Sequence, residues 1–163
     1  PYVRRRGLVE TDISFRQVLN ENMKTSDNSS QPRNFKNPML AYITPWNSQG
    51  YEMANRFVNK FTHLSPVWYE IKSKGAGFIL EGRDNSDKAW MRETRRISNI
   101  KILPRILLEA FPMQLLRKKR HRDEVIDLIV SECLVMQYDG IVLESWSRWA
   151  AYGVLHDPDM RIM

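Results

Sequence analysis

The chain has 163 residues with 25 Lys and Arg against 19 Asp and Glu, which gives a net charge of +6. Its length and apolar content allow one domain with a substantial core. The single cysteine, Cys133, excludes an intrachain disulfide, and together with three scattered histidines it makes no metal-ligand pattern. No apolar run reaches the ~18 residues of a membrane span. We therefore expect no metal, no cofactor and no membrane span.

The basic excess is concentrated in two clusters, at residues 4–6 and 117–122. Such clusters can bind nucleic acid. A platform for single strands would also interleave aromatic residues with the basic ones, and this sequence does not. We therefore interpret the second cluster as a solvated loop that leads into a helix, and we expect no nucleic-acid partner.

Residues 1–38 are expected to form an irregular N-terminal extension, of which residues 9–19 can pack as a short strand or helix onto the body. The stretch 25–32 has the polar composition of a loop. It contains Asn28-Ser29-Ser30, an acceptor triplet for N-glycosylation that indicates a secretory route. Because the chain begins with Pro1 and ends without a stop signal, we also expect a truncated sequence.

From residue 39 onward, apolar runs alternate with amphipathic segments, which predicts strands alternating with helices. A turn at 73–77 and a short apolar piece at 78–82 follow the second strand, and Pro104 predicts a distortion in the third. Ser86 or Asp87 can cap the second helix, whose Trp90, Met91 and Thr94 face the core. The expected strands are 39–46, 61–71, 100–109 and 138–145, and the expected helices are 51–60, 88–97, 121–137 and one that begins near 149.

This order predicts an α/β fold with a parallel sheet, because the helices act as crossovers. The spacing of four strands within residues 39–145 is typical of a (β/α)8 TIM barrel, which needs ~250 residues in all. Residues 39–163 are then its N-terminal half, with the first four βα units. A doubly wound open sheet is the alternative fold, but no Gly-x-Gly-x-x-Gly follows the first strand.

The fourth expected strand contains candidate functional residues, because an acidic and an aromatic side chain, Glu144 and Trp146, follow its apolar run. Residues 141–143 are all apolar, which predicts a strand covered on both faces. Alternation places Val142, Glu144 and Trp146 on one face. In a parallel barrel, the last inward positions of a strand stand at the mouth of the active site. Glu144 and Trp146 are therefore site candidates, although a glutamate solvated at a strand end is the simpler alternative.

Several further segments form a recognisable series along the chain: 41–51, 60–68, 90–92, 102–105 and 138–146, with a leader at 6–12. In this order they resemble chitinase-like proteins of the family 18 glycoside hydrolase superfamily. The resemblance implies a TIM barrel, an oligosaccharide partner similar to chitin, and a place in the secretory pathway, extracellular or in the lysosome or vacuole.

Active chitinases of this superfamily carry Asp-x-x-Asp-x-Asp-x-Glu on the fourth strand, with the last Glu as general acid. By this resemblance Asp139 and Gly140 are remnants of the motif, Val142 and Glu144 take the second and third Asp positions, and Trp146 takes the acid position. Protonating a glycosidic oxygen requires a carboxylic acid. Indole has no titratable proton near neutral pH, so the motif lacks its acid.

We therefore predict a chitinase-like protein that binds chito-oligosaccharide without hydrolysing it, that is, a pseudo-enzyme without catalytic residues. Tyr42, near the end of the first strand, is a further candidate contact, but we expect it in the core. The alternative is an active glycoside hydrolase with Glu144 as acid, paired with Glu109. A protein partner is possible but the sequence does not identify one. The predicted sugar contacts lie near the ends of strands: Trp46, Trp68, Glu109, Glu144 and Trp146.

Overall fold

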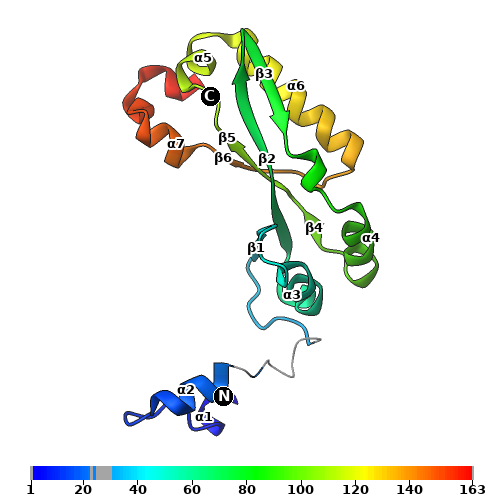
Figure 1. Ribbon diagram of the computed structural model, residues 1–163, viewed down its shortest axis with the longest axis vertical. Coiled ribbons are helices and arrows are strands. Elements are labelled where there is room, and N and C mark those ends of the chain that lie inside the picture. The colour runs from blue at the N-terminus through cyan, green and yellow to red at the C-terminus, as the bar shows by residue number, and fades with distance from the viewer. Residues whose placement is uncertain (1, 23, 25–30, 163) are drawn as a thin grey trace.

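The computed structural model describes residues 2–22, 24 and 31–162 (Figure 1). It is a mixed α/β structure in which a parallel sheet curls into half of a barrel. Hydrophobic side chains from one face of the sheet and from the helices packed on it form a single core. The α/β class and the parallel sheet predicted from the sequence are therefore confirmed, and the half-barrel is compatible with part of a βα barrel.

The sheet has the order β1-β2-β5-β6, and all neighbours on this path are parallel. Strand β4 adds a short parallel pairing to β2, and β3 folds back on β2 as an antiparallel hairpin. This hairpin was expected only as a turn and a short apolar piece. The strands are β1 (Leu40–Ile43), β2 (His63–Lys74), β3 (Gly77–Glu81), β4 (Lys101–Ile102), β5 (Arg105–Leu108) and β6 (Val142–Glu144).

The helices of the body occupy the segments between strands, as the sequence pattern predicts. Helix α6 is close to the expected 121–137, and α4 has the expected bounds. The α-helices are α3 (Gly50–Arg56), α4 (Lys88–Ile97), α5 (Pro112–Arg117), α6 (Lys119–Met136) and α7 (Trp146–Ala151), and the 3-10 helices are η1 (Val58–Lys60), η2 (Arg83–Asn85), η3 (Val154–His156) and η4 (Pro158–Ile162).

The N-terminal segment is less irregular than expected, because it contains α1 (Tyr2–Arg5) and α2 (Phe15–Asn22). Helix α2 buries none of its residues, and Figure 1 shows it apart from the sheet. Its Phe15 and Leu19 are exposed, so the expected packing of residues 9–19 on the body is not seen. The glycosylation triplet at Asn28 lies outside the described residues.

Helix α4 follows from local signals. The Asp87 carboxylate accepts the backbone N–H of Trp90 at 2.8 Å, which satisfies a donor that the first helical turn leaves unpaired. Trp90, Met91 and Thr94 are all buried, as their spacing predicts. The Trp90 ring packs edge-on against those of Tyr51 and Trp68, so the capped helix anchors an aromatic core.

A bulge in β2 determines which residues enter that core. The pairing with β5 shifts register between Val67 and Tyr69, so the consecutive residues Trp68 and Tyr69 are both buried. The chain then returns through Gly82, whose φ is +108° and where a Cβ atom would lie 1.9 Å from the Trp68 carbonyl oxygen. Only glycine fits this close approach.

The third and fourth expected strands both differ in extent. The third is divided into β4 and β5 around Pro104, which lacks the N–H that a continuous ladder needs, so the predicted distortion is confirmed. The fourth shrinks to the three residues of β6, and its Leu143 is 46% exposed. The expected burial on both faces is therefore wrong in this chain, because β6 is the outer strand and pairs with β5 alone along the sheet.

Candidate functional site

One face of the sheet is open. Along β5 the side chains alternate, with Ile106 and Leu108 buried in the core and Arg105 and Leu107 on the opposite face. The register aligns Arg105 with Val67 and Val142, and aligns Leu107 with Glu70 and Glu144. We call this surface the open face.

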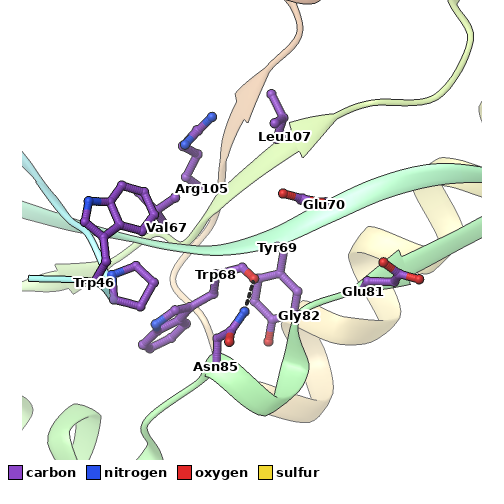
Figure 2. Close-up of a pocket in the computed structure, with 11 residues that line it drawn as sticks. Trp46, Val67, Trp68, Tyr69, Glu70, Glu81, Gly82, Asn85, Arg105 and Leu107 are labelled. Carbon is purple, nitrogen blue, oxygen red and sulfur yellow. Dashed lines mark hydrogen bonds between the residues drawn. The ribbon is translucent and has the colours of Figure 1, made fainter.

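A pocket of about 310 Å³ lies on this face (Figure 2). It is bounded at one side by Trp46, which follows β1 and is 76% exposed. At the other side, β2 and the end of β3 bring acidic side chains. Its main polar and apolar lining residues are Trp46, Val67, Glu70, Glu81, Arg105 and Leu107.

The acidic side of the pocket depends on one lysine. Glu70 and Glu81 stand opposite each other in the β2–β3 hairpin, a position where like charges repel. Lys72 lies between them, with its Nζ 2.8 Å from Oε2 of Glu70 and 2.9 Å from Oε2 of Glu81. Hydrogen bonds to the two carboxylates, first that of Glu70, raise the pKa of Lys72 above its usual value. The lysine thus makes the pair of glutamates compatible with folding.

Both carboxylates predicted to contact sugar are ion-paired. Glu144, the last residue of β6, pairs with Arg105 of the pocket and accepts a hydrogen bond from the Ser147 hydroxyl at 3.3 Å. Glu109, directly after β5, pairs with Arg148 of α7 at 2.6 Å. Glu144 therefore reaches the pocket through Arg105, whereas Glu109 belongs to the contact between the end of β5 and α7.

The predicted tryptophans are in three different environments. Trp46 lines the pocket. Trp68 also borders the pocket, but it is 2% exposed and its indole N–H donates to the Tyr51 hydroxyl at 2.7 Å, so its ring is packed in the core rather than presented to a sugar. Trp146 is 68% exposed but begins α7 rather than extending β6, so it does not share a strand face with Glu144.

Two other expectations from the sequence need correction or a new role. Tyr42 was expected in the core, but it is 56% exposed because its neighbour Ile43 is the residue that turns into the core. Asp139, which the resemblance predicts to be a remnant of the motif, has a structural contact: its Oδ2 accepts the backbone N–H of Ile102 at 2.8 Å and pairs with Arg95 at 3.1 Å. It fastens the segment before β6 to β4 and α4. At Gly140, the next residue, φ is +155°.

A buried polar cluster on the helix side of the sheet was not predicted. Glu132 of α6 is 5% exposed and accepts hydrogen bonds from the Tyr69 hydroxyl at 2.8 Å and from Nε of Arg83 at 3.0 Å. The Tyr69 and Tyr138 hydroxyls are 2.7 Å apart. The cluster joins β2, η2 and α6, so its evident role is structural.

Burial and hydrogen bonding shift the pKa values of the acidic groups in this cluster. Hydrogen bonding from the Arg83 guanidinium lowers the pKa of the Glu132 carboxyl. Burial raises the pKa of Tyr69, and it raises that of Tyr138 to about 12. The sequence does hold a signal for Glu132, because it lies seven residues after Val125 and four before Met136, and both of these are buried. The helical spacing of Val125, Leu128, Ile129 and Cys133 predicts the buried face of this helix, but of these four only Val125 is buried and the other three are half-buried.

No family model matches the chain. Within the part of the chain that the structure describes, His, Cys, Asp and Glu side chains form no group of three or more that could hold a metal ion. Over the same residues, no helix combines the length and apolarity that crossing a membrane requires.

Proposed function

We propose that this protein is a chitinase-like, non-catalytic binder of chito-oligosaccharide, and that the pocket on the open face is its sugar site. The observation that carries the proposal is the indole of Trp46, 76% exposed at the edge of a concave pocket. A broad aromatic face suits stacking on the apolar face of a sugar ring. Glu70, Glu81 and Arg105 supply the small number of polar groups that fix orientation in such sites.

The proposal also includes the fold: residues 39–163 are the first four βα units of a TIM barrel. The parallel order β1-β2-β5-β6, with helical segments between the strands, supports it. In TIM barrels the site lies at the carboxyl ends of the strands. Trp46 follows β1, Glu109 follows β5 and Glu144 ends β6, so three of the predicted residues occupy such ends. A secretory location belongs to the same proposal and rests on the family resemblance and the triplet at Asn28.

The proposal includes no hydrolysis. Trp146, at the acid position of the motif, lies on α7 and carries no acidic proton. In the alternative, Glu144 would act as the acid, which requires a carboxyl group within hydrogen-bond reach of the leaving oxygen. Arg105 and Ser147 occupy the two oxygens of Glu144. Glu144 would have to release these partners before it could act on a substrate.

The test is a calorimetric titration of the chain with a chito-oligosaccharide of four sugar units, using Trp46→Ala and the matched control Trp146→Ala. Both tryptophans are exposed, but only Trp46 lines the pocket. We expect Trp46→Ala to weaken binding about tenfold or more, which corresponds to about 1.4 kcal/mol, and Trp146→Ala to bind as the parent does. Absence of binding, or loss in Trp146→Ala alone, would overturn the assignment.

Hydrolysis is checked separately with a chromogenic chito-oligosaccharide, and we expect no release of the dye. Turnover that is present in the parent and absent in Glu144→Gln would refute the non-catalytic proposal and support the alternative. Glu109→Gln distinguishes a carboxylate pair from a single acid, because a glycosidase that uses both groups would lose activity in either variant.

A further inference from the structure

The pocket on the open face carries excess negative charge. Glu70, Glu81 and Arg105 line it, while Lys72 and Glu144 are their ion-pair partners outside the lining. These three carboxylates and two cations leave one negative charge after pairing. The single ammonium of Lys72 is shared between two glutamates, each of which stays about half exposed. These carboxylates can therefore accept further hydrogen bonds from a ligand.

The acidic side of the same pocket presents mainly hydrogen-bond acceptors. A carboxylate accepts hydrogen bonds through both oxygens and donates none. Asn85 uses one N–H of its Nδ2 to donate to the Trp68 carbonyl at 3.1 Å, which leaves its second N–H as a donor and its Oδ1 as an acceptor. The other donors of the lining include the indole N–H of Trp46 and the guanidinium of Arg105, whose Nε pairs with Glu144. The pocket therefore favours a ligand that donates hydrogen bonds.

The N-acetylated and the deacetylated forms of the repeating sugar differ in the hydrogen-bond donors that they present at carbon 2. An N-acetylated unit presents at carbon 2 one amide N–H, one carbonyl acceptor and a methyl group, all neutral. A deacetylated unit presents an ammonium group there, with three donors and a positive charge. An ammonium group matches exposed carboxylates, and the face of an indole such as Trp46 also attracts cations. An acetamide carbonyl would instead compete for the few donors present.

We infer that the pocket recognises a chito-oligosaccharide through a free 2-amino group, so that its ligand class is partly or fully deacetylated oligosaccharide rather than the fully acetylated form. This inference rests on the proposed function and specifies the substrate class of the same site. In this arrangement Trp46 stacks on the ring, while Glu70 and Glu81 accept hydrogen bonds from the ammonium group.

The experiment compares tetramers of glucosamine and of N-acetylglucosamine by calorimetry with the full chain, at a pH where the sugar amine is protonated. We expect the glucosamine tetramer to bind about tenfold more tightly at low salt, and the difference to shrink as salt screens the charges. Glu70→Gln should remove most of the preference. Glu93→Gln, which alters an exposed carboxylate of α4 outside the pocket lining, should retain it.

The possible failures are distinguishable. If the acetylated tetramer binds as tightly as the deacetylated one or more tightly, this inference is overturned and the proposed function stands. If neither tetramer binds, the proposed function fails as well. A linear diamine that binds as tightly as the glucosamine tetramer would show that charge alone is recognised, which also overturns the inference. Because the salt dependence uses the unmodified chain, the test holds even if Glu70→Gln folds poorly.

Discussion

Trp46 and Trp68 provide the sharpest test of the site, because the sequence predicts both as sugar contacts, whereas the structure exposes one and buries the other. Trp68 is 2% exposed in the core, whereas Trp46 is 76% exposed at the pocket. We predict that Trp68→Ala mainly lowers stability, while Trp46→Ala mainly lowers affinity for oligosaccharide. The two substitutions remove the same side chain, so any difference between them reports the environment.

The expected loss of stability in Trp68→Ala follows from its contacts. A buried tryptophan removes ~150–250 Å² from water, which at ~25 cal/mol per Å² amounts to about 4–6 kcal/mol. The variant also loses edge contacts with Trp90 and the hydrogen bond to the Tyr51 hydroxyl. Because the neighbours relax into part of the cavity, we expect the free energy of unfolding to fall by about 3–5 kcal/mol. Trp46→Ala should change it by no more than about 0.5 kcal/mol.

The assay is urea unfolding followed by far-ultraviolet circular dichroism, which does not depend on the tryptophan that is removed. In a chain of this size a change of 3–5 kcal/mol corresponds to a melting temperature about 10 °C lower. If Trp46→Ala were as destabilising as Trp68→Ala, Trp46 would be a packing residue and the pocket would lose its stacking platform. If Trp68→Ala kept its stability and lost sugar binding, the assignment of the two residues would be reversed.

Three further predictions concern the scaffold. Gly82→Ala should lower the free energy of unfolding by about 2 kcal/mol or more in urea denaturation, because a Cβ at φ +108° meets the Trp68 carbonyl oxygen. Asp87→Ala should cost about 1 kcal/mol in the same measurement through loss of the α4 cap. Arg83 lowers the pKa of Glu132, so this group stabilises the fold above pH 4.5 and its contribution is lost as the pH falls through the lowered pKa. Glu132→Gln should therefore reduce the melting temperature at neutral pH and flatten its decline in acid.

Each of these predictions has a result that contradicts it. An unchanged unfolding midpoint in Gly82→Ala would mean that the hairpin can move away from β2 at no cost. An unchanged midpoint in Asp87→Ala would mean that water replaces the cap. A melting temperature for Glu132→Gln that falls with acid as steeply as in the parent would assign the acid sensitivity to other carboxylates.

Several features of the fold follow from local sequence signals. Asp87 three residues before Trp90 predicts the start of α4, and the spacing of Trp90, Met91 and Thr94 predicts its buried face. Pro104 predicts the break between β4 and β5. These predictions succeed because capping, helical periodicity and the missing N–H of proline act within a few residues of chain.

The candidate site was predicted less well, because strand ends depend on pairing. Period-two alternation placed Trp146, just after the expected strand 138–145, on one face with Glu144, but that residue begins α7. Glu109 and Glu144 were recognised at the carboxyl ends of strands, but their arginine partners, Arg148 and Arg105, were not. Salt bridges between strands depend on register and on the next element's position, and neither can be read from the spacing of residues within one segment.

The sequence by itself determined the alternation of strands and helices, the parallel sheet and the cap of α4, since these depend on short-range periodicity and backbone chemistry. Tertiary structure alone decided which tryptophan faces solvent. The bulge after Val67 shifts the alternation of β2 by one residue, so Trp68 and Tyr69 are both buried and Glu70 turns to the open face, across the pocket from Trp46. A one-residue shift moves every later side chain to the opposite face of a strand, and only the pairing of β2 with β5 fixes where it occurs.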